Sequence, residues 1–143
     1  MPEERYTIPF GEARTHRVGE DISVITWGAM VHTADEAAEE LAKEDVSVEV
    51  VDLRTVMPWD RKAVLASVEK TSKALVLHED TRTGGFGAEI AATIAEEAFE
   101  SLDAPVKRIA APDAPVPFSP PLEKAFIPQV ETVASGLREL AAY

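Results

Sequence analysis

Short runs of β-branched and apolar residues alternate with segments of helical period along this chain. The runs lie at 22–27, 46–53, 73–78 and 106–110. This alternation is typical of βαβ units, in which parallel strands are joined by helical crossovers. The chain has 143 residues, so we expect one domain with a substantial core.

A further strand is predicted over residues 13–18, ahead of the first of these runs. The connection through Gly19, Glu20 and Asp21 is short, which allows this strand to run antiparallel to the others. The predicted fold class is therefore α/β. We expect a three-layer α/β/α sandwich around a mixed five-stranded sheet with one antiparallel edge strand.

Two helix starts carry capping signals. Thr33 to Glu36 has the Ser/Thr-x-x-Glu form of a capping box, which predicts a helix that opens there and runs to about Glu44. Asp60 follows a proline and a tryptophan and is suited to cap a helix whose apolar face is Val64, Leu65 and Val68.

The second half of the chain predicts three more helices. One follows the loop 81–87, and two shorter ones are expected at 122–126 and 129–140. Five prolines between Pro112 and Pro121 predict that this stretch runs extended over the surface. The residues expected to face inward from the helix after the loop are Ala88, Ala91, Ile94, Ala95, Ala98, Phe99 and Leu102.

The charge balance excludes several classes of partner. Fourteen Lys and Arg against 26 Asp and Glu give a formal net charge of −12, the wrong sign for nucleic acid or an anionic membrane. A basic protein partner fits this charge. The chain has no Cys, which excludes disulfides, thiol nucleophiles and cysteine-based metal sites.

The sequence carries no pattern of a secretory signal or of a membrane span. The first ten residues hold acidic side chains where a signal needs Lys or Arg, and no apolar run approaches ~20 residues. A cytoplasmic location is the expectation.

A glycine cluster, Gly84, Gly85 and Gly87, lies where a predicted strand passes into a helix. Phosphate-binding loops occur at such positions, but the spacing matches neither G-x-G-x-x-G nor a Walker loop. We favour a turn with positive φ and a close approach of helix to sheet over anion binding.

His78, Glu79 and Asp80 follow one another at the carboxyl end of a predicted strand, the edge at which open α/β sheets bind ligands. A histidine between carboxylates suits a general base or a metal ligand. No Ser or Cys nucleophile and no second His at ligand spacing accompanies it. We therefore expect His78 to pack at the strand end or at a subunit contact, and we assign no catalytic, cofactor-binding or metal-ligating residue. An independent small-ligand or metal-binding module is the alternative.

Asp103 has two interpretations. If it ends the helix that contains Glu96, Glu97 and Glu100, the helix dipole disfavours its charge, and a partner's Lys or Arg is expected to compensate. Otherwise Asp103 begins a turn with Ala104 and Pro105.

Several longer motifs together resemble one family. It is the C-terminal domain of the beta subunit of the thiamine diphosphate-dependent decarboxylating component of 2-oxo acid dehydrogenase complexes, a transketolase-like domain. The resemblance covers essentially the whole chain. The motifs are Val51-Asp52-Leu53-Arg54-Thr55, Pro58-Trp59-Asp60, Ser67-Val68, Lys70-Thr71, His78-Glu79, Thr83-Gly84-Gly85-Phe86-Gly87-Ala88-Glu89-Ile90, Ala104-Pro105-Val106, Pro112-Asp113 and Pro115-Val116-Pro117.

The resemblance implies a transketolase C-terminal-type fold over 13–143, with residues 1–12 as a linker from a missing N-terminal pyrimidine-binding domain. The parent reaction is oxidative decarboxylation of a 2-oxo acid with acyl transfer to a lipoyl group. The branched-chain (2-oxoisovalerate) type is favoured over the pyruvate type. Thiamine diphosphate and magnesium belong to the parent enzyme. The domain alone is expected to bind neither and to be inactive.

The resemblance also implies partners. These are the alpha subunit and second beta subunit of a heterotetramer, and the basic peripheral subunit-binding domain of the lipoyl acyltransferase. Asp103 and the terminal carboxylate at Tyr143 are the positions expected to dock that basic domain. The same domain from a transketolase or a deoxyxylulose phosphate synthase is an alternative parent.

Overall fold

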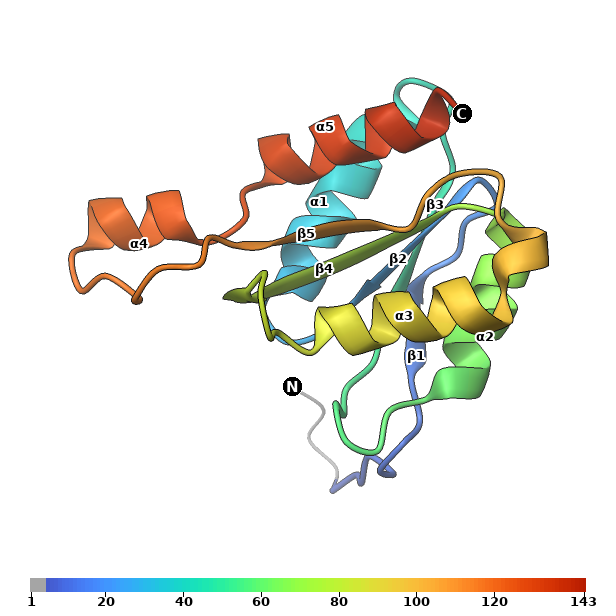
Figure 1. The fold of residues 1–143 in the computed structure, drawn as a ribbon, viewed down its shortest axis with the longest axis horizontal. Helices are drawn as coiled ribbons and strands as arrows, with labels where there is room; N and C mark the ends of the chain where they lie inside the picture. Colours follow the sequence, from blue (N-terminus) through green and yellow to red (C-terminus); the bar gives the residue numbers. More distant parts are fainter. Residues whose placement is uncertain (1–4) are drawn as a thin grey trace.

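Five strands form a single sheet in a computed structural model that describes residues 5–143 (Figure 1). Residues 1–4 of the predicted linker lie outside the described residues. The strand order is β1-β3-β2-β4-β5, with β1 antiparallel to β3 and the other neighbours parallel. The predicted mixed sheet with an antiparallel edge strand is confirmed. The strands are β1 (Arg14–Arg17), β2 (Ile22–Thr26), β3 (Val48–Asp52), β4 (Ala74–Thr81) and β5 (Lys107–Ala111).

Helices cover both faces of this sheet, which confirms the three-layer sandwich. Helices α1 and α5 pack on one face and α2 and α3 on the other, while α4 projects away from the body (Figure 1). None of the helices between residues 5 and 143 is long and apolar enough to cross a membrane. The helices are α1 (Met30–Ala42), α2 (Arg61–Thr71), α3 (Gly87–Glu97), the 3-10 turn η1 (Phe99–Ser101), α4 (Pro120–Phe126) and α5 (Val130–Ala141).

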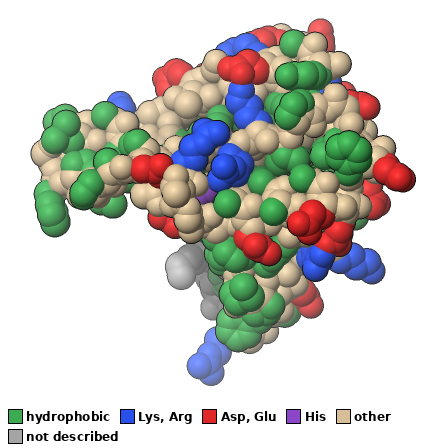
Figure 2. All heavy atoms as spheres, viewed as in Figure 1, with side chains coloured by type: hydrophobic (Ala, Val, Ile, Leu, Met, Phe, Trp, Pro, Cys, Tyr) green, Lys and Arg blue, Asp and Glu red, His purple; other side chains and the backbone are tan. Residues whose placement is uncertain are grey.

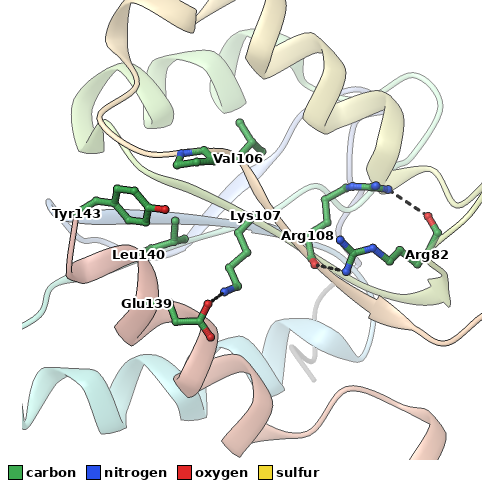
Figure 3. A pocket seen from close by; sticks show the side chains of 8 residues that line it. Arg82, Val106, Lys107, Arg108, Glu139, Leu140 and Tyr143 are labelled. Carbon is green, nitrogen blue, oxygen red and sulfur yellow. Dashed lines mark hydrogen bonds and ion pairs between the residues drawn. The ribbon is translucent and has the colours of Figure 1, made fainter.

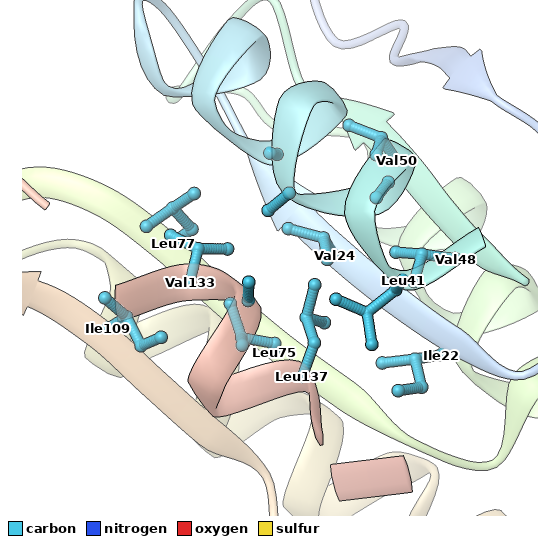
Figure 4. Packing of buried hydrophobic residues seen from close by; sticks show 14 of the residues in the cluster. Ile22, Val24, Leu41, Val48, Val50, Leu75, Leu77, Ile109, Val133 and Leu137 are labelled. Carbon is cyan, nitrogen blue, oxygen red and sulfur yellow. The ribbon is translucent and has the colours of Figure 1, made fainter. Parts of the chain in front are cut away.

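The core is divided in two by the sheet. All five residues of β2 are buried, because this central strand is covered on both faces. Val24 points toward Leu41 of α1 and Leu137 of α5 in the first cluster (Figure 4), whereas Ile25 packs with Ile90 of α3 in the second.

The helix boundaries differ from the predicted ones where burial outweighs local signals. α1 begins at Met30, so the capping box predicted at Thr33 is wrong and lies inside the helix. Met30 and Val31 are already buried against the sheet, which favours helix from that point. α4 begins at Pro120 within the stretch predicted as extended, because the first turn of a helix tolerates proline.

The helix after the loop 81–87 also ends earlier than predicted. α3 stops at Glu97, and the chain turns through η1 before β5. Ala95 and Phe99, both expected to face inward, are exposed, and Phe99 keeps 73% of its accessible surface. Because α3 ends before Phe99, the 3.6-residue repeat that would turn Phe99 inward does not extend to it.

A buried polar network fixes α2 against the sheet. The Ser23 hydroxyl of β2 lies 2.6 Å from that of Ser67 and 2.7 Å from that of Thr71. Ser67 donates to the Glu49 carboxylate at 2.6 Å, and Lys70 Nζ donates to its other oxygen at 2.5 Å. The hydrogen bond to Glu49 raises the pKa of Lys70. Each side chain of this network is thereby hydrogen-bonded, as buried polar groups require.

Asp60 links the start of α2 to the edge strand. Its Oδ1 accepts the Ala63 backbone N–H at 3.0 Å, which confirms the predicted cap. Its Oδ2 accepts the Ala13 N–H at 2.9 Å, one residue before β1. One carboxylate therefore orders both a helix start and the antiparallel strand.

We expect Asp60→Ala to lower the free energy of unfolding by about 1–2 kcal/mol, since it removes the cap and the bond to Ala13. Asp60→Asn is expected to lose less, because its amide oxygen still serves one of the two N–H groups. Urea unfolding measures both, with the exposed Lys62→Ala as control. A loss no larger than that of Lys62→Ala contradicts this role.

Candidate functional site

The carboxyl edge of the parallel strands is the place at which an α/β sheet of this kind holds a ligand. The chain moves from β2 outward to β3 and then back across to β4, so the point of reversal lies between the ends of β2 and β4. Trp27 directly follows β2, and His78 lies in β4 at the matching level.

Aromatic side chains fill this crevice. Trp27 and His78 stack with ring centroids 5.4 Å apart and planes inclined by 6°. Phe86 meets Trp27 edge-on at 6.3 Å. His78 is only 1% exposed. The crevice therefore holds protein side chains where a ligand would otherwise lie.

The glycine loop closes over the same ring. A Cβ on Gly85 would collide with the Thr81 carbonyl and the His78 ring, and a Cβ on Gly87 would overlap the His78 ring. Gly84 has φ +76°, the left-handed region that glycine occupies at no steric cost. The glycines thus serve a turn and a close approach of α3 to β4.

The surroundings of His78 lower the pKa of its ring. Burial is the largest cause that lowers its pKa, and Arg108 acts in the same direction, while Asp80 opposes them. Neither ring nitrogen has a hydrogen-bond partner among the described residues. A ring so enclosed has no path to abstract a proton from a bound molecule.

The neighbours of His78 on β4 point outward. Glu79 and Asp80 are exposed, and Asp80 accepts the Thr81 N–H at 2.7 Å. Within residues 5–143, no three His, Asp or Glu side chains gather in the manner of a metal site.

Asp103 lies outside α3, although one of the two interpretations placed it at the end of that helix. α3 stops at Glu97, and Asp103 begins the turn before β5, with its N–H donating to the Ser72 carbonyl at 2.9 Å. The interpretation from the helix dipole is wrong, and the turn with Ala104 and Pro105 is observed. The Asp103 side chain is exposed.

The fold brings the Asp103 turn to the end of the chain. Pro105 and Val106, which follow Asp103, line a hollow of about 390 Å³ together with Tyr143 (Figure 3). Tyr143 is 70% exposed. Asp103 and Tyr143, predicted from distant parts of the sequence, therefore border the same end of the sheet.

Basic side chains line the far side of this hollow. Lys107 is paired with Glu139 of α5, and Arg82 and Arg108 each donate to the other's backbone carbonyl (Figure 3).

Trp27 and Phe86 are the site residues that the sequence interpretation missed. Trp27 directly follows β2 and Phe86 directly precedes α3, and both positions can be read from the sequence. Their contact with His78 depends on β2 lying beside β4, and that order is a property of the sheet.

Comparisons with known proteins agree on one family. The family described as transketolase, C-terminal domain, matches residues 11–133. The 2-oxoisovalerate dehydrogenase subunit beta of Bacillus subtilis (strain 168) is 45% identical over all of this chain and 44% of its own length. The pyruvate dehydrogenase E1 component subunit beta of the same strain is 46% identical, again over all of this chain and 44% of the relative. The chain therefore spans under half the length of these relatives.

Two further matches are named for other activities. The beta subunit of acetoin:2,6-dichlorophenolindophenol oxidoreductase from Cupriavidus necator is 45% identical over 97% of this chain and 41% of that protein. A solved split-gene transketolase, described as an inactive beta4 tetramer, superposes with a TM-score of 0.82 at 24% identity. It covers 99% of this chain and 44% of that chain, and at this identity it supports the fold alone.

We expect Gly87→Ala to destabilise the chain by about 1–3 kcal/mol, because the new Cβ overlaps the His78 ring. Combining Gly87→Ala with His78→Ala is expected to restore part of that loss, which a double-mutant cycle measures by urea unfolding. Gly84→Ala is the control, since its Cβ meets open space and only φ opposes it. Additive losses at positions 87 and 78 would contradict the contact.

The lowered pKa of His78 predicts a pH dependence of stability. The unfolded histidine titrates near 6.5, and the folded one below that, so between the two values the unfolded state binds more protons. The free energy of unfolding should be undiminished above pH 6.5 and decrease as pH falls through this window. NMR titration of the His78 ring checks the direction, and a midpoint at or above 6.5 contradicts it.

Proposed function

The chain belongs to the transketolase C-terminal domain family, and on this premise we propose that it is the C-terminal assembly domain of a 2-oxo acid dehydrogenase beta subunit. The observation that carries this proposal is the match to such beta subunits over the whole chain at 45–46% identity. The parent reaction is oxidative decarboxylation of a 2-oxo acid with transfer of the acyl group to lipoyl. The chain acts there in the cytoplasm, linked through residues 1–12 to a pyrimidine-binding domain.

The substrate of the parent enzyme is selected outside this domain. Relatives named for 2-oxoisovalerate, pyruvate and acetoin are equally similar to the chain, at 45%, 46% and 45% identity. If this domain determined the substrate, we would expect the chain to be clearly more similar to the relatives named for one substrate than to the others. The branched-chain type remains our prediction.

Thiamine diphosphate and magnesium do not fit the residues of this domain. Trp27, His78 and Phe86 fill the crevice at the sheet edge. The His78 ring takes up the space beside Gly85 and Gly87, so a diphosphate could not lie there. We therefore assign the cofactor to other parts of the parent enzyme. The same filled crevice argues against an independent small-ligand or metal-binding module.

Docking of a basic partner is the role that this domain's surface supports. Asp103 and Tyr143 are both exposed at one end of the sheet, and the formal charge of −12 attracts a cationic domain over a distance. We assign this end to the basic peripheral subunit-binding domain of the lipoyl acyltransferase. The alpha subunit and a second beta subunit complete the proposed assembly.

We expect Asp103→Lys to slow association with an isolated basic subunit-binding domain by about 3- to 10-fold at low ionic strength. Glu36→Lys makes the same change of charge on the exposed face of α1 and serves as the matched control. Stopped-flow or surface plasmon resonance measures the on-rates. Equal slowing by both variants removes Asp103 from the contact, and no binding to the wild-type chain removes the docking role.

A further inference from the structure

A basic groove follows β5, the last strand at one edge of the sheet. Arg82, Lys107 and Arg108 line two adjoining hollows there, of about 390 and about 560 Å³. Figure 2 shows Lys and Arg side chains gathered over β5 on this face. Sites for small molecules typically measure about 300–1,000 Å³. The groove therefore has the size of a ligand site, and its charge is opposite to the net charge of −12 of the chain.

The three cations of the basic groove differ in their partners. Lys107 is paired with Glu139 of α5. Within residues 5–143, no carboxylate oxygen lies within 4.0 Å of the guanidinium of Arg82 or Arg108. Arg82 is exposed and Arg108 is half-buried. These two arginines therefore offer their charge to a bound anion.

Backbone contacts fix how the two guanidinium groups lie. Arg108 donates to the Arg82 carbonyl at 3.1 Å, and Arg82 donates in return to the Arg108 carbonyl at 3.5 Å (Figure 3). A guanidinium carries several N–H groups, and those left over from this contact match the paired oxygens of a carboxylate or a phosphate. Like charges repel, so an anion between the two groups removes a cost and also adds hydrogen bonds.

Helix α5 supplies the other wall of the larger hollow. Thr132 and Ser135 lie there and are exposed, and their hydroxyls are able to donate to the oxygens of an anion. Glu131 and Glu139 also line this hollow and repel anions, but Glu139 is held by Lys107. The groove thus combines cations on β5 with hydroxyls on α5.

We propose that the basic groove binds a small molecule that carries a phosphate or a carboxylate group. The oxyanion lies between the guanidinium groups of Arg82 and Arg108, and Lys107 reaches it when Glu139 is displaced. This site goes beyond the docking proposed for a basic domain. The two proposals fail separately, because one is measured with a small anion and the other with a cationic protein.

NMR titration of the full chain with pyrophosphate and with citrate tests this site, with chloride added to keep the ionic strength constant. Amide shifts at Arg82, Lys107 and Arg108 are expected to saturate with a dissociation constant of about 1 mM or lower for at least one of the two anions. The two anions distinguish recognition of phosphate from recognition of carboxylate. Shifts that stay linear up to about 20 mM for both anions, or that saturate only elsewhere in the chain, overturn the proposal.

Arg82→Gln is expected to weaken the binding of the anion about 5- to 10-fold, because it removes one of the two guanidinium groups. The side chain is exposed and lies outside the core, so the variant remains folded. Arg14→Gln makes the same change of charge at an exposed arginine of β1, on the opposite edge of the sheet, and is the matched control. Equal weakening by the two variants overturns the site.

Glu139→Gln is expected to act in the opposite direction and to tighten binding about 2- to 5-fold, because it releases Lys107 and removes a carboxylate from the groove. Glu36→Gln removes the same charge from the exposed face of α1 and serves as the control. The same titration measures both variants. A gain no larger than that of Glu36→Gln contradicts the part assigned to Lys107.

Discussion

The stack of Trp27 on His78 decides how the carboxyl edge of the sheet is used. The rings lie parallel at 5.4 Å in the crevice where the strand order reverses, and Phe86 covers them from the side. Because the imidazole and the Thr81 carbonyl fill this space, positions 85 and 87 accept only glycine, and α3 begins directly against β4. Burial then lowers the pKa of the histidine. His78, which resembles a catalytic residue in the sequence, thus packs between β4, the glycine loop and α3.

Two surfaces outside the filled crevice lie at opposite ends of the sheet (Figure 1). At one end Asp103 and Tyr143 are exposed, next to a hollow that Arg82, Lys107 and Arg108 line. The other end carries the projecting segment 112–126, where the chain has little charge. These surfaces face apart (Figure 1).

The buried polar network ties α2 to the sheet. Ser67, Lys70 and Thr71 belong to the motifs that resemble the family, and in the fold they form one network with Ser23 and Glu49. The network holds α2 on the sheet, and the Asp60 carboxylate adds β1 to the same unit. The motif residues therefore serve the packing of the domain.

The sequence by itself determined the layered fold, the antiparallel edge strand and the Asp60 cap, because periodicity and capping are local properties. Its family motifs also led to the correct family. Only the tertiary structure decided the start of α1, the exposure of Phe99 and the turn at Asp103. It alone placed Trp27 against His78, and the Asp103 turn and Tyr143 on one hollow. Those contacts join residues far apart in the chain, and the order of strands that brings them together is set by burial over the whole sheet rather than by any local pattern.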